Sequence, residues 1–202
     1  TPVLDPVTER GLHMKPLQLP HPPIAVAAST SLSGSLKVAG AQGWSPMSSS
    51  ILSKTFLPGH WNTYAEAANA AGNSANRSDW RIARDVFVGP TPRLARERAR
   101  AVLGRNYDVH QLPSRKNTAQ MGLMKIDPDM KDEDIDVDYL MEHVWIVGDP
   151  KECADKVRAL YDDVGGFGTL LSITADSDDA SWDHESLTLL AEEVGPRIAD
   201  LG

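Results

Sequence analysis

The sequence predicts an α/β fold built from parallel β/α units. Three observations favour this class. Short apolar runs of strand length recur along the chain, segments with helical spacing of their apolar residues follow them, and polar or glycine-containing turns separate the two. Strands that alternate with helices pair in parallel through right-handed crossovers. With 202 residues, the chain is shorter than the about 250 that a complete eight-fold β/α barrel needs.

The first β/α unit follows a proline-rich lead-in. Residues 1–23 are expected to be extended, because proline fixes φ and removes a backbone donor. Residues 24–28 form a continuous apolar run with the length of a strand buried on both faces. A polar turn over 29–34 then leads into 35–43, whose apolar positions permit a short helix. Strand, turn and helix together make one unit.

The second unit combines a weak strand with a longer helix. The strand is expected at 44–47, and the helix at 53–71, where the apolar residues form a stripe that Gly72 ends. Pro58 and Gly59 are expected to split this helix near its start.

The third unit begins with a strand at 80–88, in which Arg84 is the polar exception. Thr91 is a good N-cap and Pro92 suits the first helical position, so a helix is expected to start there. Its core face would contain the following apolar residues: Leu94, Ala95, Ala99, Val102 and Leu103.

The segment 106–138 is the least regular part of the sequence. It ends in an acidic run over 127–138, which lacks the central glycine and terminal glutamate of a calcium-binding EF-hand loop. We therefore expect a long solvated insertion here.

The last unit begins with a helix that has a capping pattern. Asp149 and Pro150 suit its N-terminus, and Glu152 lies three residues after the cap. Glycines at 165–166 end this helix before a buried strand over 167–173. The final helix is expected at 183–199, bent or shortened by Pro196.

Composition excludes several classes of function. The net charge of −8 argues against a nucleic-acid surface, which needs clustered lysine and arginine. The single cysteine, Cys153, rules out an intramolecular disulfide framework and predicts a reducing compartment. No apolar run approaches the eighteen residues of a membrane helix, and the first residues carry no signal-peptide pattern. We expect a cytoplasmic location, although a targeting segment upstream of Thr1 stays open.

Most catalytic and metal-binding signatures are absent from the sequence. It has no nucleophile elbow, phosphate-binding P-loop or zinc-protease motif, and its histidines lack ligand spacing, so no metal is predicted. His60 and His143 lie beside tryptophans. They could line an aromatic-walled pocket, but packing at the edge of the core with a satisfied ring nitrogen is the favoured interpretation.

The turn after the first strand is the strongest candidate site from residues alone. Ser29, Thr30 and Ser31 end a predicted parallel strand just before a helix, where β/α folds bind ligands. Backbone N–H groups and hydroxyls there can hold a phosphate. Serines also serve simply as turn residues and N-caps, and spacing alone leaves both alternatives open.

An ensemble of segments resembles the bacterial luciferase-like, flavin-dependent monooxygenases, and among them most closely the alkanal and limonene monooxygenase group. The matching segments run in the same order over nearly all of the chain from Lys15: KPLQLPHPPIAVAAST (15–30), LKVAGAQGWSPMS (36–48), HWNTYAEAANAAG (60–72), WRIARDVFVGPT (80–91), HVWIVGDPKECADKV (143–157) and GGFGTLL (165–171).

This resemblance implies an eight-fold β/α barrel that binds reduced FMN and inserts one oxygen atom from O₂ into a small apolar substrate such as an aldehyde or terpene. A separate flavin reductase would supply the reduced flavin. The family's fifth strand, whose end contacts the flavin and its phosphate, corresponds here to 24–30. The resemblance therefore assigns cofactor contacts to Ala28, Ser29, Thr30 and Ser31, although Ala28 stands where the luciferases have an acidic residue.

The resemblance assigns no catalytic residue, and it makes His143 and Trp145 candidates for lining the substrate pocket. The predicted units correspond to the second half of the family barrel, so residues 24–202 are expected to form a C-terminal half-barrel. We hypothesise that the chain is a fragment that lacks its N-terminal half, or that two copies associate as a homodimer. Two alternatives remain: a deazaflavin-dependent oxidoreductase of the same superfamily, and a non-catalytic half-barrel that acts in assembly.

Overall fold

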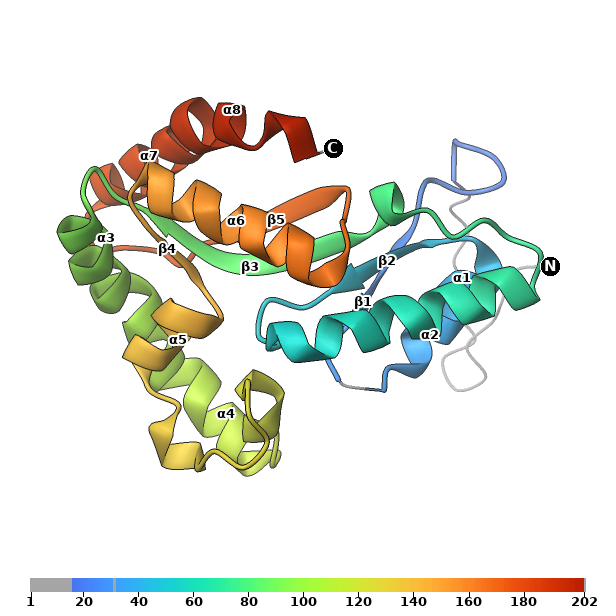
Figure 1. The fold of residues 1–202 in the computed structure, drawn as a ribbon, viewed down its shortest axis with the longest axis horizontal. Coiled ribbons are helices and arrows are strands. Elements are labelled where there is room, and N and C mark those ends of the chain that lie inside the picture. The colour runs from blue at the N-terminus through green and yellow to red at the C-terminus, as the bar shows by residue number, and fades with distance from the viewer. Residues whose placement is uncertain (1–15, 31, 202) are drawn as a thin grey trace, which may run out of the picture.

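The computed structural model describes residues 16–30 and 32–201 and contains a parallel five-stranded sheet (Figure 1). The strands are β1 (Ala25–Ala28), β2 (Ser45–Ser48), β3 (Arg81–Val88), β4 (Ile146–Gly148) and β5 (Thr169–Ile173). Their order is β1-β2-β3-β4, and β5 also pairs with β3. Every pairing is parallel, which confirms the predicted fold class.

Helices connect the strands and cover one face of the sheet. Within the described residues they are α1 (Gly34–Gln42), α2 (Leu57–Ala70), α3 (Pro92–Ala99), α4 (Leu112–Asn117), α5 (Val137–His143), α6 (Pro150–Val164), α7 (Ala180–Leu189) and α8 (Gly195–Arg197).

The predicted caps of two helices are present. The Asp149 side chain accepts a hydrogen bond from the backbone N–H of Glu152 at 2.8 Å and begins α6. Thr91 caps α3 by accepting from the N–H of Leu94 at 3.3 Å. Gly165 ends α6 with φ of 75°, a left-handed conformation that suits glycine.

The register divides the strand residues into two faces. Residues paired across parallel strands point to the same side, and neighbours along a strand point to opposite sides. Ala28, Ser48 and Ile82 are aligned with one another and are buried beneath the helices. The aligned residues one position earlier, Ala27 and Met47 among them, are exposed or half-buried. We call these the helix face and the open face of the sheet.

Two hydrophobic clusters stabilise the fold. The first lies between the helix face and α1, α2 and α6, and contains Trp61, Trp80 and Ile82. The second surrounds Phe87 at the end of β3 and joins α3 to α5 through Tyr107 and Trp145, among others.

The expected solvated insertion over 106–138 is wrong in part. Helical structure continues without a break from α3 to the end of α4, through π-helical turns at Arg100–Gly104 and Tyr107–Gln111. Tyr107, Met121, Met124 and other apolar side chains of the segment are buried in the second cluster. The acidic run itself is largely exposed, as the charges require.

The two outer strands are less buried than their sequences predict. β1 is mostly exposed and β5 is half-buried, although both were expected to be covered on both faces. The reason is that helices cover only one face of β1 and β5, while the open face of these two strands has no covering layer among the described residues. At the end of β3, by contrast, the second cluster covers the open face at Phe87. An apolar run therefore shows that a strand can be buried on both faces. It does not show whether a second layer covers it in this chain.

Smaller differences concern boundaries. The break expected at Pro58 and Gly59 lies just before Leu57, because Pro58 occupies the first turn of α2 after a 3₁₀ turn at Lys54–Phe56. β4, a strand of three residues, was not predicted. Residues 16–23 have no helix or strand, as expected, while the rest of the predicted lead-in lies outside the described residues. None of the described helices combines the length and apolar character that spanning a membrane demands.

Candidate functional site

The carboxyl ends of the parallel strands meet at one edge of the sheet, where β/α folds place their ligand sites. Three of the predicted cofactor-binding residues lie there, at the end of β1. Ala28 is buried at 1% exposure, whereas Ser29 and Thr30 are exposed. Ser31 falls outside the described residues. The turn leads directly towards α1, as the sequence predicts.

A buried histidine fastens this turn to the helix layer. His60 of α2 is 1% exposed, and its Nε2 lies 2.7 Å from the carbonyl oxygen of Thr30. Its Nδ1 lies 3.0 Å from Ser48 Oγ, which accepts a hydrogen bond from Trp80 Nε1 at 3.1 Å. Since the indole can only donate, the Ser48 hydroxyl is free to donate to Nδ1, and Nε2–H then donates to Thr30.

The chain Trp80–Ser48–His60–Thr30 has a clear electrostatic consequence. Burial lowers the pKa of His60, although the bond to Thr30 opposes the shift. The imidazole is therefore neutral at physiological pH, with both ring nitrogens bonded. This agrees with the favoured interpretation of His60 as a satisfied core histidine, and adds that it fixes the backbone of the predicted cofactor turn.

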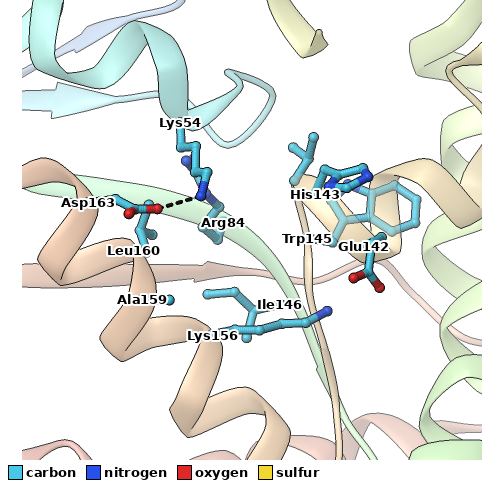
Figure 2. Close-up of a pocket in the computed structure, with 11 residues that line it drawn as sticks. Lys54, Arg84, Glu142, His143, Trp145, Ile146, Lys156, Ala159, Leu160 and Asp163 are labelled. Atoms are coloured by element: carbon cyan, nitrogen blue, oxygen red, sulfur yellow. Dashed lines mark hydrogen bonds and ion pairs between the residues drawn. The ribbon is translucent and has the colours of Figure 1, made fainter. Parts of the chain in front are cut away.

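The two predicted substrate-pocket residues lie together elsewhere. His143 and Trp145 line a cavity of about 130 Å³ that also contains Arg84 and Lys156. Figure 2 shows them on the opposite side of it from Arg84, with the Trp145 ring directed away. We call it the Arg84 cavity. It lies on the helix face of the sheet, between α6 and the segment that joins α5 to β4. None of residues 28–30 lines it, so the structure does not bring the two predicted groups into one site.

A larger open cavity, of about 590 Å³, lies beyond the end of β5. Residues 174–176, which follow the strand, form one wall, and the π-helical region around Arg105 and His110 forms the other. Its position beyond a carboxyl end fits a ligand site of this fold class. No local pattern in the sequence indicates this cavity, because its walls come from segments distant along the chain.

Two charged neighbours within β3 were missed as site candidates. Arg84 and Asp85 are 2% and 3% exposed, in a strand that is otherwise apolar after Arg81. Burial raises the pKa of Asp85, and its Oδ2 has no hydrogen-bond partner among the described residues. The sequence pattern that could have indicated them is a pair of adjacent charged residues within a predicted buried strand. Charged groups are rarely buried without a partner or a function.

Comparison with known proteins places this arrangement in a family. The family model described as luciferase-like monooxygenase matches residues 4–166. The 2,5-diketocamphane 1,2-monooxygenase 1 of Pseudomonas putida is 33% identical over 184 residues, which are 87% of this chain and 49% of that protein. Limonene 1,2-monooxygenase of Rhodococcus erythropolis is 27% identical over 152 residues, 72% of this chain and 36% of that protein.

A solved structure agrees with these relatives. It is the oxygenating constituent of 3,6-diketocamphane monooxygenase from Pseudomonas putida, a type II Baeyer-Villiger monooxygenase in complex with FMN. It superposes with a TM-score of 0.81 at 30% identity, covering 87% of this chain and 49% of that one. The chain thus spans about half the length of the first relatives it matches. By the extent of the family match and the identity to these relatives, the chain belongs to the luciferase-like monooxygenase family.

Proposed function

We propose that this chain forms the C-terminal half of a flavin-dependent monooxygenase, which uses reduced FMN and O₂ to insert one oxygen atom into a small apolar substrate. The observation that carries the proposal is the likeness to the FMN-bound oxygenating constituent, at 30% identity over 87% of the chain. The relatives named as diketocamphane and limonene monooxygenases support a terpene-like substrate.

The residues of the turn at 28–30 fit the phosphate of FMN. Ser29 and Thr30 are exposed at the carboxyl edge, and neither the turn nor the first turn of α1 contains an acidic residue that would repel a phosphate. The carbonyl oxygen of Thr30 is already bonded to His60, so this acceptor is satisfied within the protein. In the proposed enzyme these residues bind and orient the phosphate end, and the assignment of a further contact to Ser31 stays a prediction.

In the proposed enzyme the cofactor and the protein have different roles. When bound, the reduced flavin supplies the electrons for oxygen activation. The chain contributes the anchoring turn and the apolar surroundings that exclude water. The assignment of His143 and Trp145 to the substrate pocket stays a prediction.

The proposal includes partners and a location. Reduced FMN would come from a separate flavin reductase, and the open face of the sheet would be covered by an N-terminal half-barrel or by a second copy in a homodimer. A cytoplasmic location is part of the proposal, and the single, buried Cys153 is in keeping with it.

Anaerobic titration with reduced FMN, followed by fluorescence, tests the cofactor assignment. We expect the chain to bind FMN about tenfold more tightly than riboflavin, which lacks the phosphate, a difference of about 1.4 kcal/mol. The double variant Ser29→Ala, Thr30→Ala should narrow this ratio, and Ser114→Ala, on the distant α4, should leave it unchanged. Saturable binding of a reduced deazaflavin alone would favour the hydride-transfer alternative, and binding of no flavin would favour the non-catalytic assembly module.

A further inference from the structure

The Arg84 cavity contains a buried cation that the proposed function does not use. The Arg84 side chain is 2% exposed, and its Nη1 donates to the carbonyl oxygen of Ala83 at 2.9 Å. Among the described residues no carboxylate lies within ion-pair distance of it. Asp85 follows it directly in the strand and therefore points to the opposite face of the sheet.

The other charges on the cavity wall leave an excess of positive charge. Lys54 is paired with Asp163 at 2.5 Å, and Lys156 donates to the carbonyl oxygen of Met141 at 2.6 Å. Glu142 is the remaining carboxylate on the wall. Arg84 and the two lysines thus face two carboxylates, and Figure 2 shows Lys54 and Arg84 side by side at one end of the cavity.

Arg84 keeps its charge at neutral pH. Burial lowers its pKa to about 10, and the neighbouring Asp85 opposes the shift. Burying a guanidinium without a carboxylate destabilises the fold, because only an opposite charge and hydrogen bonds offset the free energy of lost hydration. Four further N–H groups of the guanidinium remain available besides the one that Ala83 accepts.

We propose that the Arg84 cavity binds a small oxyanion, a phosphate or a carboxylate group, between Arg84, Lys54 and Lys156. The cavity volume of about 130 Å³ is several times the roughly 10–15 Å³ that a cavity needs to hold one water molecule. This accommodates a free tetrahedral anion or a short carboxylate. Trp145 and Ile146 form the apolar wall opposite. The site does not depend on the proposed flavin turn, because residues 28–30 take no part in it.

Thermal unfolding of the full 202-residue chain at fixed ionic strength tests the site. Inorganic phosphate, sulfate and acetate at 10 mM would each be compared with chloride. We expect phosphate or acetate to raise the Tm of the wild type by a few degrees, and the better of the two identifies the ligand group. Arg84→Met should abolish the shift. Arg81→Met, in the same strand but on the open face, should retain it.

Isothermal titration separates binding from general stability. Lys156→Met keeps the aliphatic stem and removes one cation, so the affinity for the better anion should fall at least fivefold even if Arg84→Met does not fold. An equal Tm shift in Arg84→Met, an equal effect of chloride, or unchanged affinity in Lys156→Met would overturn the proposal. If the wild type bound none of these anions, the proposal would also be overturned. The counter-charge of Arg84 would then be expected to be a carboxylate side chain of a polypeptide.

Discussion

Arg84 and Asp85 are adjacent in sequence but lie in different environments. Alternation along β3 directs Arg84 to the helix face and Asp85 to the open face. Asp85 is paired in the register with Ile173 at the end of β5, so it lies near the carboxyl edge. Each therefore requires its own partner, because the sheet separates them.

The first prediction concerns Asp85. Burial raises its pKa above the ordinary value of 3.8, an effect that Ser50 and Arg84 only partly oppose. Above pH 3.8 the unfolded chain loses this proton before the folded one does, so the contribution of Asp85 to stability falls as the pH rises through the folded pKa. Asp85→Asn should have a higher Tm than the wild type at pH 7, and the difference should vanish below pH 3.8. The exposed Asp134→Asn is the control, and an equal effect there would contradict the assignment.

The second prediction concerns His60. Its pKa is lowered by burial from 6.5, so the unfolded state takes up a proton first and the stability that neutral His60 provides is lost as the pH falls from about 6.5 through the folded pKa. His60→Gln disrupts two buried hydrogen bonds and should cost about 2 kcal/mol of unfolding free energy at pH 7.5. Denaturant unfolding between pH 7.5 and 5 should show a flatter pH dependence in this variant. If the exposed His143→Gln flattened it equally, the effect would not belong to His60.

At the scale of elements, α1 and α2 pack unusually closely. A Cβ built on Gly40 would lie 2.4 Å from the carbonyl oxygen of Tyr64 and 2.8 Å from the backbone nitrogen of Ala68. These are backbone atoms, so only movement of a whole helix could relieve the clash. The same α2 contains His60, which links this contact to the position of the cofactor turn.

Gly40→Ala is therefore predicted to separate the two helices. It should cost about 2 kcal/mol or more of unfolding free energy, because overpacking a tight site typically costs about 1–3 kcal/mol. Gly59→Ala, at an exposed position in the first turn of α2, meets no atom within 4 Å and should instead be neutral or stabilising by up to about 1 kcal/mol. Urea unfolding compares the two, and equal stability of both variants would exclude the close contact.

Elements were predictable from sequence where local chemistry specifies them. The cap at Asp149, the strand at β3 and the order of the units depend on neighbouring residues, and all three are present. The turn at 28–30 was also locatable, because it follows a strand. What could not be predicted depends on distant partners: the bond from His60 to Thr30, and the cavity that brings Arg84 and Trp145 together. No local pattern encodes such contacts.

At the scale of the molecule, the sheet has unpaired strand edges, and its open face is uncovered at β1 and β5. Within the described residues β1 pairs only with β2, and β4 and β5 each pair only with β3, whereas a closed barrel leaves no such edges. Ile173, on the open face, is 42% exposed, and Met47 and Leu171 on that face are half-buried. Exposed apolar surface next to unpaired strand edges favours association.

The fourth prediction follows from this surface. If the open face is what associates, the chain should form dimers or larger species at micromolar concentration, and Ile173→Glu should shift them towards monomer because a charge would be buried in the contact. Leu187→Glu removes a comparably exposed apolar side chain that lies on α7 and not in a strand, and should leave association unchanged. Light scattering coupled to size exclusion measures the mass of each species. A wild-type chain that stays monomeric would refute self-association, and the proposed cover of the open face would then have to be a different polypeptide, such as an N-terminal half-barrel.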